Sequence, residues 1–271
     1  MSKAVASTLF YLPGADAGST QWRIQSIQMV NWGGFQGHAS IQLAPSTTVL
    51  SGPSGSGKST LLDAYIAVMM DSNTQFNGAS NDAPGRARGA SQRNLVSYLR
   101  GKLDAGRDSD TGEWADQVLR GRGSATWGAL AITFIDDNQR SYTIARLYYV
   151  PRSAVRDGEL TRKMCTIDGG IDLRDLEPFV AEKFDKRAVE GRFTGLKMHE
   201  SYGAFAQAYF TRLGIGANGD GTKAMRLLAR IQAGRQVHTV DELYKSMVLE
   251  EPGTYQAADA AVAHFKDLED A

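Results

Sequence analysis

The chain has 271 residues, with 30 basic and 30 acidic side chains and a formal net charge of zero. Apolar residues make up 42% of it, which excludes wholesale disorder, because disordered chains carry few apolar residues and usually a large net charge. The even charge argues against a globally basic nucleic-acid binder. A single cysteine, Cys165, excludes an intramolecular disulfide and a multi-cysteine zinc site, and the four histidines follow no metal-ligand spacing.

Residues 1–20 are rich in small residues and are predicted to form a flexible leader. Their short apolar stretch is broken by Ser7 and Thr8, which is unlike a signal peptide. No apolar run approaches the roughly 18 residues of a membrane span. We therefore expect a cytoplasmic protein without a membrane partner.

The next part of the chain predicts strands followed by a helix. Residues 22–30 and 38–43 alternate and are rich in β-prone residues, and 31–35 between them is a turn with two glycines. A third strand is predicted over 47–50. Apolar residues at intervals of three and four then predict a helix over 58–70.

A long polar loop is predicted over 71–90, and long loops are often functional. The stretch 86–107 contains Arg86, Arg88, Arg93 and three further basic residues against one acid. The neutral total conceals this local basic cluster, which is a candidate contact for DNA or for the nucleotide.

The remainder predicts a β-hairpin over 125–150, a short strand over 163–167 and a helical part over 172–250. The acids at the end of 132–137 are interpreted as the hairpin turn, since a second strand follows at once. Individual helices are predicted over 172–184, 201–213, 222–233, 239–249 and 254–270. The last helix spaces its apolar residues like about two heptads of a coiled coil.

Residues 52–59 satisfy the pattern G-x-x-x-x-G-K-[ST] completely. Glycines let main-chain amides surround phosphate oxygens, and a helix N-terminus adds amide donors and a favourable dipole. Lys58 is predicted to reach the β- and γ-phosphates, and Ser59 to bind Mg²⁺. The whole predicted cradle consists of Gly52, Ser54, Gly55, Ser56, Gly57, Lys58, Ser59 and Thr60. ATP and Mg²⁺ are the expected cofactors, although the loop reads phosphates and leaves GTP open.

Residues 27–35 and 50–64 resemble the N-terminal ATPase head of the structural maintenance of chromosomes (SMC) superfamily. The stretch 223–271 more narrowly resembles the SMC-like JetC subunit of the bacterial Wadjet systems and MksF, relatives of MukB. The resemblance implies an α/β fold of the ABC/SMC-head type, with the N-terminal lobe over 21–253. It also implies that 254–271 begin a coiled-coil arm.

In the resembling family, two heads sandwich two ATP molecules and act on double-stranded DNA. The implied partners are the chain's own C-terminal lobe, a second head, kleisin-type and accessory subunits, and DNA of a bacterial nucleoid or plasmid. The signature loop and catalytic glutamate belong to the C-terminal lobe and are not found here, so hydrolysis by this chain alone is not expected. The family's Mg²⁺-completing glutamine is assigned first to Gln232 and second to Gln207, with a plain surface glutamine as the alternative for each.

Two other functions remain open at this point. Residues 49–60 also resemble a guanylate kinase, although the loop lies further into the chain than in small kinases and no nucleotide-acceptor segment is recognisable. The third interpretation is an assembly module that senses a nucleotide without hydrolysing it.

Overall fold

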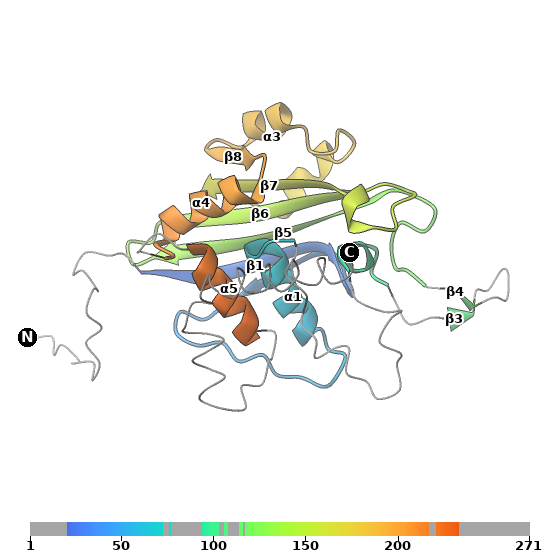
Figure 1. The fold of residues 1–271 in the computed structure, drawn as a ribbon, viewed down its shortest axis with the longest axis horizontal. Coiled ribbons are helices and arrows are strands. Elements are labelled where there is room, and N and C mark those ends of the chain that lie inside the picture. The colour runs from blue at the N-terminus through green and yellow to red at the C-terminus, as the bar shows by residue number, and fades with distance from the viewer. Residues whose placement is uncertain are drawn as a thin grey trace, which may run out of the picture.

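The computed structural model describes residues 21–72, 76, 94–102, 106–107, 114–115, 117–216 and 221–232. Its centre is a six-stranded sheet with the order β2-β1-β5-β6-β7-β8 (Figure 1). Every neighbouring pair in this sheet is antiparallel. The mixed α/β class is confirmed, and the described sheet is of the antiparallel kind.

The strands fall close to their predicted positions. The two predicted N-terminal strands are β1 (Trp22–Trp32) and β2 (Phe35–Gln42), the predicted hairpin is β5 (Thr126–Asp136) with β6 (Ser141–Val150), and the short predicted strand is β7 (Thr161–Asp168). Three strands were not predicted: β8 (Leu196–His199), and the two-stranded pair β3 (Gly106–Arg107) and β4 (Trp114–Ala115).

Alternation along the central strands creates two hydrophobic layers. In β5 the large residues Leu130 and Ile132 pack on one face, and the intervening Ala129 and Ala131 pack on the other. All four are fully buried. Because successive strand side chains point to opposite faces, a strand that is buried on both faces reads as a nearly continuous apolar run.

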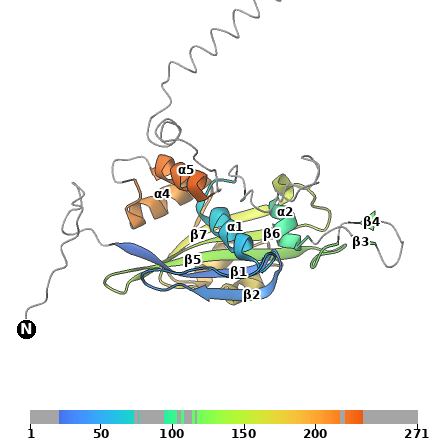
Figure 2. The same ribbon diagram turned by 90° about the horizontal axis from the view of Figure 1, so that it is seen from below.

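Helices cover both faces of the sheet (Figures 1 and 2). One face carries α1 (Lys58–Met69), α2 (Leu95–Arg100), α4 (Tyr202–Leu213) and α5 (Gly221–Gln232). The other carries the 3₁₀ helix η3 (Leu173–Phe179) and α3 (Lys186–Arg192). A further 3₁₀ turn, η2 (Asp157–Glu159), precedes β7. The helices expected over 58–70, 201–213 and 222–233 are thus confirmed, whereas α2 and α3 are new.

Helix α1 is fixed at its C-terminal end by donors from two elements. The hydroxyl of Tyr202 donates to the Met69 carbonyl at 3.0 Å, and that of Tyr209 donates to the same oxygen. The guanidinium of Arg146 in β6 donates to the Met70 carbonyl. Since a helix ends in carbonyls without intrahelical partners, these donors hold α1 against α4 and the sheet.

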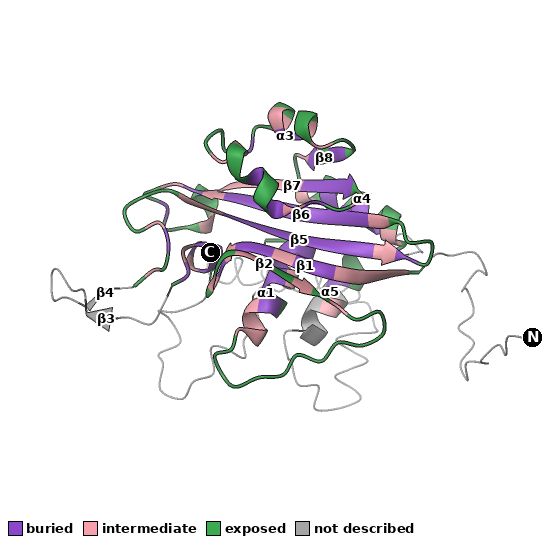
Figure 3. Cartoon of the chain, turned by 180° about the vertical axis from the view of Figure 1, so that it is seen from behind, coloured by how far each residue is buried: buried purple, intermediate pink, exposed green. Residues whose placement is uncertain are grey.

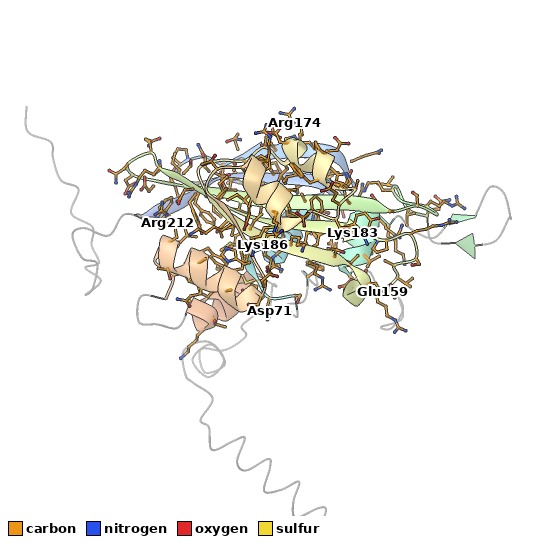
Figure 4. The ribbon with its side chains drawn as sticks, turned by 90° about the horizontal axis from the view of Figure 1, so that it is seen from above. Asp71, Glu159, Arg174, Lys183, Lys186 and Arg212 are labelled. Carbon is orange, nitrogen blue, oxygen red and sulfur yellow. The ribbon has the colours of Figure 1, made fainter. Side chains whose placement is uncertain are left out.

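Helix α4 is in turn tied to the sheet by Arg212, labelled in Figure 4. Its guanidinium binds the Asp168 carboxylate at 2.6 Å. The same cation lies over the rings of Trp22 and Tyr142, at 5.5 and 5.6 Å from their centroids. These contacts hold α4 against β1, β6 and β7.

Two sequence predictions are wrong. Residues 47–50 form no strand, and within the described chain no strand pairs with them. The exposed fraction is 82% for Val49 and 41% for Leu50, so local β-propensity has no partner here. The predicted helix over 172–184 is a 3₁₀ helix containing Pro178, and the part 172–250 also contains β8.

Several predictions lie outside the described residues. They are the leader 1–20, Arg86, Arg88 and Arg93, the helix over 239–249 and the coiled-coil start 254–271. In the described part of the chain, no helix combines the length and apolarity needed to cross a membrane.

Candidate nucleotide-binding site

The predicted phosphate loop leads directly into α1. Gly57 is the N-cap residue with a left-handed φ of 94°, and the first intrahelical bond runs from the Leu61 amide to the Gly57 carbonyl at 3.0 Å. The amides of Lys58, Ser59 and Thr60 precede that bond and have no acceptor within the helix. These amides and the positive end of the helix dipole favour an anion at this position.

Gly57 is required here for two physical reasons. Its positive φ is a conformation that residues with a Cβ rarely adopt. A Cβ built on Gly57 would also lie 3.1 Å from Cζ of Phe35, closer than an ordinary contact. A side chain at this position would therefore displace the ring of Phe35.

Lys58 is directed at its own loop. Its Nζ donates to the Gly52 carbonyl at 2.6 Å, to the Pro53 carbonyl at 2.8 Å and to Ser56 Oγ at 3.4 Å. The ammonium thus lies among the residues that were predicted to surround phosphate. A phosphate oxygen would compete for the same N–H donors, and charge-assisted bonds of this kind are stronger than bonds to neutral carbonyls.

Ser59 and Thr60 are half-buried in the first turn of α1. A hydroxyl at this place suits Mg²⁺, a hard cation that prefers oxygen ligands and keeps several waters. The donor set therefore fits a nucleotide phosphate with Mg²⁺, which would neutralise charge on the phosphates when bound. Of the eight predicted cradle residues, Lys58, Ser59 and Thr60 lie in the first turn of α1 and Gly57 is its N-cap. Lys58 also contacts Gly52 and Ser56.

The structure does not bring Gln207 beside Ser59. Gln207 is exposed on α4 and donates to Thr211 in the same helix at 3.3 Å. Helix α4 contacts α1 at Met69, ten residues or about 15 Å of helix from Ser59. Gln232 lies at the C-terminal end of α5 with its side chain outside the described part, so its role as a metal ligand stays a prediction.

Asp136 belongs to the hairpin turn, as the sequence indicates. Its carboxylate accepts the amides of Asn138 and Arg140 at 2.9 and 2.8 Å and the Nε–H of Arg140 at 2.7 Å. Burial of this carboxyl raises its pKa. The hydrogen bonds and charge of Arg140, together with the Asn138 amide, outweigh burial, so the net pKa lies below the ordinary value. The carboxylate of Asp136 therefore stabilises the hairpin turn through these hydrogen bonds.

The segment before the loop is exposed. All residues from 44 to 56 are exposed, and Figure 3 shows this connection in green beneath the sheet. The loop therefore has little buried contact on its N-terminal side. Its position is determined mainly where it enters α1.

Residues 24–83 match a family model described as the P-loop containing region of AAA domain. These residues are therefore similar to an AAA-type P-loop region. The match covers β1 from Ile24 onward, β2, the phosphate loop and α1, so it agrees with the site built above. A P-loop region of this type indicates nucleotide binding and NTPase chemistry in general. No curated protein gives a significant match to the chain.

The residues that support the P-loop from behind were missed by the sequence analysis. They are Trp32, Phe35, Asp63, Tyr98 and Arg120. The turn at 31–35 was recognised, but its packing on α1 depends on a contact between separate elements. A polar residue on the apolar face of α1, Asp63, was the one available signal of a buried partner.

Proposed function

We propose that this chain is the N-terminal lobe of an SMC-like ATPase head that binds ATP and Mg²⁺ at the P-loop and acts on DNA. One observation carries the proposal: a complete phosphate loop opens α1, and the apolar segment that leads into this loop is exposed and pairs with no strand among the described residues. A phosphate loop ordinarily follows a strand of a sheet. The lobe is therefore proposed to gain strands from elsewhere.

The exposed side chains support a missing partner at this place. Val49 and Leu50 precede the loop, and Leu62 on α1 is 37% exposed. Exposed apolar residues can mark an interaction surface, and residues 47–50 have the composition of a strand. The proposed partner is the C-terminal lobe of the head, whose strands would pair with residues 47–50.

In this function the chain's own residues bind and orient the nucleotide. The amides at the start of α1 and the Lys58 ammonium hold the phosphates, and the Ser59 hydroxyl holds the metal. The carboxylate that activates water would come from the C-terminal lobe. The finer assignments are a second head sandwiching ATP, kleisin-type and accessory subunits, and a role in bacterial plasmid defence or chromosome organisation. The arm over 254–271 belongs to the same proposal.

The 271-residue chain alone is expected to bind ATP and to hydrolyse it negligibly. The reason is that a bound nucleotide needs a base or water-positioning residue for turnover. Phosphate release is measured with purified protein at several concentrations, and Lys58→Ala serves as the contamination control. Robust turnover that depends on Lys58 would refute the half-head assignment and would favour a self-sufficient enzyme such as a nucleotide kinase.

Charge reversal at Arg86 and Arg88 is expected to weaken binding to duplex DNA and to flatten its salt dependence by about two units of slope. Each arginine that contacts a phosphate releases about one counterion, so losing two contacts removes that release. Fluorescence anisotropy against salt concentration measures the slope. The matched control reverses Arg187 and Arg192, which lie on α3, on the face of the sheet away from α1. An unchanged slope in the Arg86/Arg88 variant would assign the basic cluster to another partner.

A further inference from the structure

The turn between β1 and β2 packs directly on the start of α1. The indole Nε1 of Trp32 donates to the Thr60 carbonyl at 2.9 Å, across 28 residues of sequence. A Cβ on Gly33 would lie 2.5 Å from Cγ2 of Thr60, so the backbone of the turn touches the helix. The ring of Phe35 flanks Gly57. One short turn thus contacts the last residue of the phosphate loop and the first turn of the helix.

Helix α2 supports this turn from a second side. The rings of Trp32 and Tyr98 are stacked, with centroids 4.5 Å apart and planes 8° from parallel. The Tyr98 hydroxyl donates to the Asp63 carboxylate, which is fully buried in α1. Thr60 and Asp63 are three residues apart and therefore lie on the same face of α1. Trp32 and Tyr98 therefore contact that face at Thr60 and Asp63 respectively.

Arg120 locks the turn to α2. Its guanidinium donates to the carbonyls of Gly33 at 2.8 Å and Phe35 at 3.3 Å in the turn, and to those of Tyr98 and Leu99 in α2, both at 3.1 Å. Arg120 is 8% exposed, and burial lowers its pKa to about 10. It therefore remains a cation at neutral pH, and four carbonyls share its donors.

We propose that Trp32, Phe35 and Arg120 are positioning residues for the phosphate loop and set its affinity for nucleotide. The loop is exposed on its N-terminal side, so its geometry depends on what holds the first turn of α1. A binding site gains affinity when its donors are held in the bound geometry beforehand. Trp32 and Phe35 supply that hold, and Arg120 keeps both in place. This inference rests on the proposed nucleotide binding.

The test compares two hydrogen bonds at opposite ends of one helix. Trp32→Phe removes the donor to the Thr60 carbonyl, and the matched control Tyr202→Phe removes a donor to the Met69 carbonyl. Each carbonyl keeps another donor: Tyr209 for Met69, and the helix itself for Thr60. Phe35→Ala is a second variant at the loop that leaves the Trp32 stack intact.

Two measurements on the full chain separate the positioning role from the proposed function. Amide hydrogen exchange without nucleotide reports the order of the first turn of α1 directly. Titration with fluorescent ATP reports affinity. We expect Trp32→Phe and Phe35→Ala to speed exchange at residues 61–64, whose amides close the first turn of α1 beginning with the bond from Leu61 to Gly57. We also expect both variants to weaken ATP binding by about threefold to tenfold. Tyr202→Phe should change affinity less than about twofold.

The outcomes are distinct. Faster exchange confined to the first turn in Trp32→Phe and Phe35→Ala supports the positioning role. Failure of the wild-type chain to bind ATP would refute the proposed function but would leave this exchange result standing. Unchanged exchange and affinity in both turn variants would overturn the positioning role. Equal weakening by Tyr202→Phe would also overturn it, because the effect would then be general destabilisation of α1.

Discussion

Replacing Lys58 with alanine is expected to lower the affinity for ATP by at least about a hundredfold, or about 2.8 kcal/mol. The structure directs this ammonium at the phosphate loop, through its bonds to Gly52, Pro53 and Ser56. A charge-assisted hydrogen bond contributes about 1.5–3 kcal/mol, and one ammonium can serve more than one phosphate oxygen. Titration with a fluorescent ATP analogue measures the loss.

The control for this experiment is Lys197→Ala, which removes an exposed lysine on β8. The net charge changes equally in the two variants, so a general electrostatic effect would appear in both. Thermal melting of both variants checks that α1 remains folded after its loop loses the internal bonds of Lys58. Wild-type affinity in folded Lys58→Ala protein would refute the assignment of residues 52–59 as the phosphate cradle.

Replacing Arg120 with methionine is expected to destabilise the fold by about 3 kcal/mol. The carbonyls of Gly33, Phe35 and Leu99 lose a donor, and each lost hydrogen bond near the protein interior costs about 1 kcal/mol. Tyr98 is affected less, because its carbonyl also accepts the amides of Gly33 and Gly101. Denaturant unfolding followed by circular dichroism measures the change.

Arg122→Met is the matched control for the stability experiment, because Arg122 is exposed two residues further along the chain. Its substitution is expected to change stability by less than about 0.5 kcal/mol. Arg120→Lys keeps the charge but not the forked donors, so an intermediate loss is expected. Equal stability of Arg120→Met and wild type would show that the four carbonyls do not depend on this guanidinium.

Most of the sheet could be predicted because its signals are local. The apolar runs that became β5 and β6 flank an Asp-Asp-Asn-Gln turn, and residues 58–69 repeat apolar positions at helical intervals. Helix α2 was missed because it is only six residues long and lies among polar segments. Strand β8 was missed because four residues give no period, and it exists by pairing with β7.

The segment 47–50 shows the opposite failure. Its residues favour a strand, but a strand needs a neighbour to accept and donate its main-chain hydrogen bonds. Within the described chain that neighbour is absent, and Val49 stays exposed. Propensity without a partner therefore gave a wrong prediction, and the same residues now supply the main support for the proposed second lobe.

The sequence by itself determined the phosphate loop. Eight consecutive positions carry that chemistry, since the glycines, Lys58 and Ser59 act through the local backbone that they form. Only the tertiary structure decided what holds the loop in place. Trp32, Tyr98 and Arg120 come from segments up to 88 positions apart, and they meet because α1 and α2 pack on one face of the sheet beside the end of β1. Contacts between distant segments leave no periodic trace in a sequence, because packing rather than spacing selects them.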